Sequence, residues 1–227
     1  MENDSVQVKN NIIQDNMYYK KELVLSYIIQ YPSFLSNRFY TNAINRCYKI
    51  KALAFEQYCR QRLFKLAVKE YEYSIENGFP VRAFDAVLNY TITYNDHCTL
   101  SLYFDQYEYT GGAHGSTLRY SDTWHLKNSR LIKLRQLFSS DLNYRGYIIK
   151  TINAQIAEQI ESGNDIYFEE YQKNVKKYFN QNSFYLTQKG VVIYFQQYEI
   201  APYAAGIVEF TIPYSDENIV RPNCNLI

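Results

Sequence analysis

Two segments of this 227-residue chain alternate apolar and polar residues on either side of a turn. Between residues 88 and 94, Leu, Tyr, Ile and Tyr occupy every second position. After Asn95 and Asp96, which favour a turn, Leu, Leu and Phe repeat the alternation at positions 100, 102 and 104. Successive side chains of a strand point to opposite faces, so this pattern predicts two antiparallel strands that share one buried face.

Helical periodicity predicts what lies beside these strands. Apolar residues at positions 44, 48, 55, 59 and 66 recur at four- and seven-residue steps, which predicts a helix running to about Tyr73. A second helix is expected to carry Ile148, Ile152 and Ile156 and to stop at Gly163, and a shorter one follows. The two strands and a third at residues 117–126 are expected to form an antiparallel meander, and we expect both long helices to pack on its apolar side. The remaining strands are expected over residues 21–32, 117–126, 184–186, 191–195 and 206–212.

This order of strands and helices is typical of an α+β fold with an antiparallel sheet and long helices packed on one face. The charge is balanced, with 24 Lys and Arg against 23 Asp and Glu, which argues against a nucleic-acid partner. No stretch approaches the roughly twenty apolar residues of a membrane-spanning helix, and the first residues lack a signal-peptide pattern. We therefore expect no membrane segment in this chain.

The four cysteines show no close pair. Cys47 and Cys59 fall on one predicted helix about 18 Å apart, at 1.5 Å per residue, so they cannot bridge each other. Cys98 and Cys224 have no neighbouring cysteine in the sequence. We expect four free thiols and no disulfide, a pattern that fits a reducing compartment better than an oxidising one.

No motif for catalysis, metal or cofactor binding is present. The three histidines, His97, His114 and His125, form no HxxH pattern, and the chain has no CxxC, GxSxG or GxGxxG. His97 and Cys98 are adjacent, so on a strand their side chains would point apart. The carboxylates that could pair across strands are Asp105, Glu108, Glu199 and Glu209, with no separation fixed by the sequence. We expect no metal, no cofactor and no enzymatic activity.

Two segments differ from ordinary strand and helix sequence. Residues 109–115 read YTGGAHG, and their glycines permit either a tight turn or backbone amides open to a ligand. Residues 198–207 read YEIAPYAAGI, which interrupts two strands and leaves Tyr198, Glu199 and Tyr203 near the surface of a loop. Surface loops carry binding residues more often than cores do.

These two segments, with residues 123–138 and 206–214, resemble the RsiV-like and PdaC-like bacterial envelope family. The resemblance spans roughly Leu23 to Tyr214 and forms two adjoining modules, which we place at residues 21–116 and 117–216. Residues 1–20 are a polar leader expected to be poorly ordered, and residues 217–227 are a tail.

The resemblance implies a binding role. The family includes the extracytoplasmic domain of a lysozyme-sensing anti-sigma factor and the non-catalytic region of peptidoglycan deacetylases. The ligand implied is a lysozyme-like protein or a peptidoglycan-derived fragment. This chain lacks the membrane helix and sigma-binding segment of the first and the catalytic domain of the second. The candidate binding residues are Tyr109, Gly111, Gly112, Ala113, His114 and Gly115, together with Tyr198, Glu199, Pro202, Tyr203 and Gly206.

Three hypotheses remain open from the sequence. The first is a non-catalytic binding or sensor domain. The second is a hydrolase of envelope glycan or peptide that uses His114 with Glu199 or Asp105. The third is a structural oligomer that buries a tyrosine-rich face, since the chain contains 25 tyrosines. The family is extracytoplasmic, but the chain shows no leader or anchor, so a cytoplasmic location also stays open.

Overall fold

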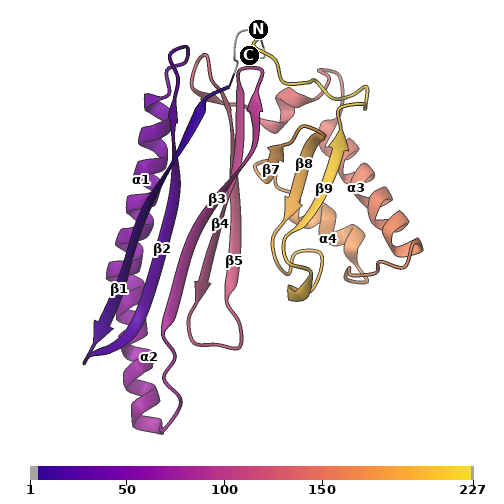
Figure 1. Cartoon of the computed structure of the whole chain (residues 1–227). Helices are drawn as coiled ribbons and strands as arrows, with labels where there is room; N and C mark the ends of the chain where they lie inside the picture. Colours follow the sequence, from indigo (N-terminus) through magenta and orange to yellow (C-terminus); the bar gives the residue numbers. More distant parts are fainter. Residues whose placement is uncertain (1–4, 226–227) are drawn as a thin grey trace. The chain divides into compact units, whose positions relative to one another are not determined.

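The computed structural model describes residues 5–225, which form two compact units (Figure 1). Among these residues, unit 2 contains 7–90 and 104–118, and unit 1 contains 5–6, 91–103 and 119–225. The chain is α+β, as expected, and its first sheet has the strand order β1-β2-β3-β4-β5-β6. Its strands are β1 (Gln7–Tyr19), β2 (Glu22–Leu35), β3 (Phe84–Asp96), β4 (Thr99–Tyr109), β5 (Ser116–His125) and β6 (Arg130–Leu131).

Residues 7–19 of the polar leader form the strand β1, and residues 1–4 lie outside the described part of the chain. β1 pairs with β2 in an antiparallel hairpin from Gln7 opposite Leu35 to Tyr19 opposite Glu22, so the expectation of poor order differs from what the structure shows. The turn consists of Lys20 and Lys21, both at positive φ (47° and 71°), as a two-residue hairpin turn requires. β1 is an edge strand in which eight of the 13 residues are exposed and none is buried, which explains its polar composition.

β2 and β3 are parallel, with Leu25 opposite Phe84 and Ile29 opposite Leu88. The sheet is therefore mixed, because this one parallel pair adjoins the expected antiparallel strands. A parallel pair needs a long crossover, which the helical segment between the two strands provides. This segment comprises α1 (Asn42–Tyr58), a π-helical turn η1 (Cys59–Leu63) and α2 (Phe64–Asn77), and Figure 1 shows it running beside β1 and β2.

The π-helical turn changes which face of the helix is buried. Leu66 was expected on the buried face but is 51% exposed, whereas Leu63 and Ala67 are buried instead. A π turn adds residues to the helical repeat and so rotates every later side chain around the axis. Before this turn the expected face is correct. Tyr48 packs its ring against Phe34 of β2 and Phe104 of β4, with centroid distances of 6.0 and 5.3 Å.

The β3–β4 hairpin turns two residues later than expected. His97 and Cys98 form the turn, at φ values of 48° and 59°. Asn95, which favours turns, is used elsewhere: its side chain accepts from the Val6 amide at 2.9 Å and donates to the Val6 carbonyl at 2.7 Å. The two-residue connection makes β3 and β4 antiparallel, as the alternation predicted.

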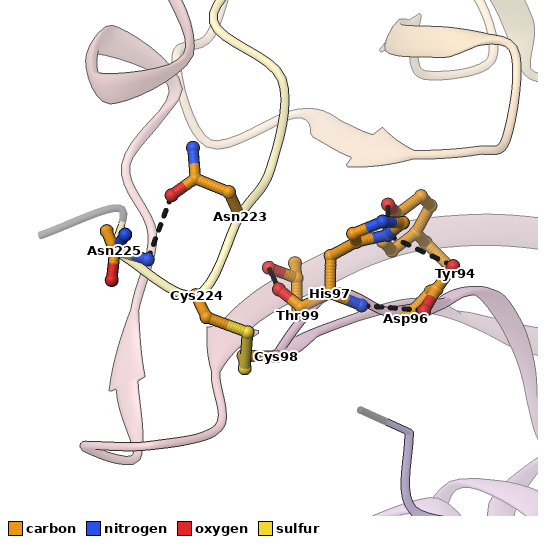
Figure 2. Close-up of a disulfide and its surroundings, with 8 residues drawn as sticks. All are labelled: Tyr94, Asp96, His97, Cys98, Thr99, Asn223, Cys224 and Asn225. Atoms are coloured by element: carbon orange, nitrogen blue, oxygen red, sulfur yellow. Dashed lines mark hydrogen bonds and ion pairs between the residues drawn. A yellow bond between two sulfur atoms is a disulfide. The ribbon is translucent and has the colours of Figure 1, made fainter. Parts of the chain in front are cut away.

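A disulfide joins this turn to the C-terminal tail (Figure 2). Cys98 and Cys224 are 126 residues apart in sequence, yet their Cα atoms lie 5.0 Å apart. The expectation of four free thiols was therefore wrong, because sequence spacing excludes only local pairs. Cys47 and Cys59 are free, and Cys59 is fully buried.

Unit 1 also contains a three-stranded antiparallel sheet in the order β7-β8-β9. Helix α3 packs against β9, and its buried Ile148, Ile152 and Ile156 share one core cluster with Ile193 and Phe210. Helix α3 therefore covers this second sheet, whereas we expected it to pack on the meander of the first sheet. Within the described residues, no helix is both long and apolar enough to span a membrane. The further elements are η2 (Leu134–Leu137), α3 (Tyr144–Glu161), α4 (Tyr171–Tyr178), β7 (Phe184–Leu186), β8 (Gly190–Phe195), η3 (Tyr203–Ala205) and β9 (Val208–Pro213).

Candidate functional site

The glycines of the first candidate loop, which joins β4 to β5 in unit 2, have different roles. A Cβ atom on Gly115 would lie 2.3 Å from the ring of Tyr107, so this position has room only for glycine unless the ring moves. Gly111 has a φ of 87°, which side chains rarely adopt. At Gly112 the nearest atom to an added Cβ would be 3.9 Å away. Gly111 and Gly115 therefore shape the loop, and Gly112 lies on its exposed surface.

Two polar side chains hold the loop in place. Nδ1 of His114 lies 2.9 Å from the Gly115 carbonyl oxygen. A carbonyl only accepts, so Nδ1 is the donor in this contact. Arg82 donates to both the Tyr109 hydroxyl and the Gly112 carbonyl at 3.3 Å.

A shallow pocket of about 210 Å³ lies beside this loop. Its position next to Gly111 and its mixed polar and apolar lining suit it to contact with a ligand group. No sequence motif marks the residues of this pocket outside the loop, because they come from α2 and the segment after it. The lining residues are Glu70, Ser74, Phe79, Pro80, Arg82 and Gly111.

The second candidate loop joins β8 to β9 in unit 1 and presents two tyrosines. Tyr198 is 55% exposed, and its ring lies 5.8 Å from that of Tyr203, centroid to centroid. Its φ of 66° is a strained value for a bulky residue. The next residues anchor the loop, because Ile200 and Ala201 are buried and the Ile200 carbonyl accepts from the Phe168 amide at 3.0 Å. Such strain is concentrated at functional sites.

Glu199 is an anchored carboxylate. Its Oε2 accepts from the Gln196 amide at 2.7 Å, so the side chain closes the start of the loop. Burial raises the pKa of Glu199, and the hydrogen bond from the Gln196 amide opposes that rise. Pro202 leads into the short helix η3, and Gly206 ends it at a φ of 68°.

The structure therefore places the candidate residues in two separate groups. Tyr109, Gly111, Gly112, His114 and Gly115 share the loop of unit 2. Ala113 lies in the same loop, and the loop of unit 1 holds the other five, Tyr198, Glu199, Pro202, Tyr203 and Gly206. Across residues 5–225, no three His, Cys, Asp or Glu side chains are grouped as they would be to hold a metal ion.

A buried charged cluster in unit 1 was missed by the sequence reading. Arg119 is only 9% exposed and forms an ion pair with Glu209. Its guanidinium lies 3.7 Å from the ring centroid of Tyr103, a cation–π contact. Burial and the Glu209 carboxylate together raise the pKa of Tyr185, whose ring packs against Tyr103 at 5.1 Å. This cluster fixes the position of Glu209 on β9.

These features define the class: a two-unit α+β protein with one tyrosine- and glycine-containing loop on each unit. Residues 19–117 match the family model described as deacetylase PdaC, and residues 135–215 match a model described as a protein of unknown function, DUF3298. The anti-sigma-V factor RsiV of Bacillus subtilis (strain 168) is 37% identical over 91 residues, which are 38% of this chain and 32% of that protein. Together these matches support an RsiV-like and PdaC-like family for the chain.

Two solved structures share the fold. A DUF3298 family member from Bacteroides fragilis NCTC 9343 matches with a TM-score of 0.73 and 19% identity, over 97% of this chain and 96% of that chain. A DUF3298 family protein from Pseudomonas aeruginosa PAO1 matches with a TM-score of 0.63 and 17% identity, over 98% and 97%. At these identities the likeness establishes the fold alone. The segment matched in the anti-sigma factor spans about a third of that protein's length.

Proposed function

We propose that the chain is a non-catalytic ligand-binding or sensor domain of the cell-envelope type. Its ligand would be a lysozyme-like protein or a fragment derived from peptidoglycan. The observation that carries the proposal is the exposed Tyr198, whose ring contacts the half-buried Tyr203, on a strained but anchored loop. The 37% identity to an anti-sigma factor supports the sensor reading.

The chemistry of the two loops suits binding. Tyrosine combines a flat apolar face with a hydroxyl group and loses little conformational entropy when it is immobilised, so it is favoured in binding surfaces. The loop around Tyr198 is already held by buried neighbours, which lowers the cost of ordering it on binding. The glycine loop adds the exposed backbone of Gly112. We infer that each loop contributes contacts of its own.

The disulfide supports a location outside the cytoplasm. Disulfides persist in oxidising compartments and are rare where thiols are kept reduced. The Cys98–Cys224 bond therefore favours an extracytoplasmic location over the cytoplasmic one. This location suits a ligand from the cell envelope.

An enzymatic alternative is kept as an outcome of the test, because one matching family model is described as a deacetylase. In that case His114 would act with Asp105 or Glu199. The Glu199 carboxylate already accepts a hydrogen bond from its own loop, and it belongs to a different unit from His114. A symmetric contact between copies through the tyrosine-rich surface is the third outcome.

The test combines binding and turnover. Calorimetric titrations against lysozymes and muropeptides should give saturable heat for one ligand class, with no cleavage or deacetylation of the muropeptides. Tyr203→Ala and His114→Ala should each weaken binding by about 1–2 kcal/mol if they lie at the centre of the contact. Turnover that is lost in His114→Ala would overturn the non-catalytic reading. Self-association that displaces every ligand would favour the oligomer.

A further inference from the structure

A pocket of about 480 Å³ lies at the β5–β6 hairpin of unit 1, within the residue 123–138 segment and outside both candidate loops. β5 and β6 pair with Trp124 opposite Leu131 and His125 opposite Arg130, and a four-residue turn connects them. The lining residues are His125, Asn128, Arg130, Leu131, Ile132, Lys133 and Gln136.

His125 is an unsatisfied histidine in the wall of this pocket. The residue is 5% exposed, and neither Nδ1 nor Nε2 has a hydrogen-bond partner among the described residues. A buried polar group normally has a partner, because losing its hydration without one is costly. The imidazole is therefore an unused hydrogen-bonding group within the lining.

The side-chain oxygens of the two amides in the lining, Asn128 and Gln136, already accept hydrogen bonds. Oδ1 of Asn128 accepts from the Arg130 amide at 3.0 Å, and Oε1 of Gln136 accepts from the Lys133 amide at 2.8 Å. Because the partners are backbone N–H donors, these positions must be oxygens. Each side chain then still offers both hydrogens of its NH₂ group as donors to a ligand.

The charged side chains of the lining also favour a ligand that accepts hydrogen bonds. Arg130 and Lys133 are exposed, and neither has an ion-pair partner among residues 5–225. The lining contains no Asp or Glu. Donors and positive charge without a carboxylate favour a ligand that only accepts hydrogen bonds.

We propose that this pocket binds an oxyanion group, carboxylate or phosphate, of a small ligand. The guanidinium of Arg130 and the ammonium of Lys133 supply the charge, the amides of Asn128 and Gln136 supply further donors, and the buried His125 ring forms part of the wall. Arginine matches the planar, two-oxygen edge of such groups. This site is independent of the two loops, and the proposal does not rest on the function proposed above.

The test follows the His125 imidazole directly. The chain has three histidines, so the ring carbon–proton signals in a two-dimensional NMR spectrum can be assigned with the variants His97→Gln and His114→Gln. The protein is titrated at fixed ionic strength with sodium phosphate, with sodium succinate and with sodium chloride. We expect a saturable shift of the His125 signal with phosphate or succinate but not with chloride. The ion that saturates first assigns the source of the oxyanion.

Charge variants separate a built site from general attraction. Arg130→Gln and Lys133→Gln should each weaken the oxyanion about tenfold, the effect of losing one charge-assisted hydrogen bond. Lys127→Gln removes a charge from the same turn at a residue outside the lining and should leave the affinity unchanged. The proposal is overturned if no probe gives a saturable shift, or if Lys127→Gln weakens binding as much as Arg130→Gln. All the substituted side chains are exposed, so folding is not at risk.

Discussion

Replacing Cys98 and Cys224 together by serine removes the covalent link between the β3–β4 turn and the C-terminal tail. The link closes a loop of 126 residues, and the chain-entropy model gives about 5 kcal/mol of stabilisation for a loop of this length at 25 °C. Native disulfides contribute about 2–5 kcal/mol in practice, so we expect a loss of about 3 kcal/mol. With a urea slope of about 2 kcal/mol per molar, the unfolding midpoint should fall by about 1.5 M.

Fluorescence of Trp124, the one tryptophan, reports this transition, because it is buried in the same unit as the disulfide. Cys47→Ser is the matched control, since it removes a free thiol, and it should shift stability by less than about 0.5 kcal/mol. Thiol titration of the unreduced, denatured protein should count two thiols from Cys47 and Cys59. A count of four, or an unchanged midpoint in the double variant, would refute the cross-link.

Three further predictions concern stability and are read from denaturant midpoints. Glu209→Gln removes the carboxylate that pairs with the buried Arg119 and should lower the free energy of unfolding by about 2 kcal/mol, between the values for exposed and buried pairs. Adding Arg119→Met should recover part of this loss. Strictly additive effects of the two substitutions would contradict the coupling. Gly115→Ala should destabilise through its clash with Tyr107 and be tolerated in a Tyr107→Ala background, and equal costs in both backgrounds would disprove the clash. Burial raises the pKa of Cys59 to about 12 from its ordinary 9.0. The thiol therefore ionises at lower pH in the unfolded chain, and the free energy of unfolding should fall as pH rises from 9 to 12. Cys59→Ala should lose less stability over this range, and equal losses would count against the shift.

Local signals predicted much of the fold. The isoleucine periodicity of α3 correctly identified Ile148, Ile152 and Ile156 as buried, because a helix presents every third or fourth residue to its core. The alternation around the β3–β4 turn correctly predicted an antiparallel pair. What failed depended on partners far away in the sequence. Neither the pairing of β1 with β2 nor the Cys98–Cys224 bond has a local signature.

Side-chain roles were harder to predict than element types. Alternation along β5 predicts that Leu118 shares the apolar face of Trp124, but Leu118 is 53% exposed, while its neighbour Arg119 is buried over Tyr103. Alternation alone cannot show this inversion, because it depends on a carboxylate and an aromatic ring from other strands. In the candidate loops, composition identified the segments. That Gly115 shapes the loop whereas Gly112 lies exposed could be seen only from the contacts around each residue.

The most direct test of the proposed binding function compares the half-buried Tyr203 with an exposed tyrosine outside the candidate loops. Tyr203 belongs to the candidate loop of unit 1, whereas Tyr18, 58% exposed, lies on β1 outside both loops. Calorimetry should measure the affinity of the wild type, Tyr203→Ala and Tyr18→Ala for the lysozyme or muropeptide that binds, with circular dichroism confirming that each is folded. We expect Tyr203→Ala to weaken the binding free energy by about 1–2 kcal/mol and Tyr18→Ala to leave it unchanged. Equal affinities in all three folded proteins would contradict it.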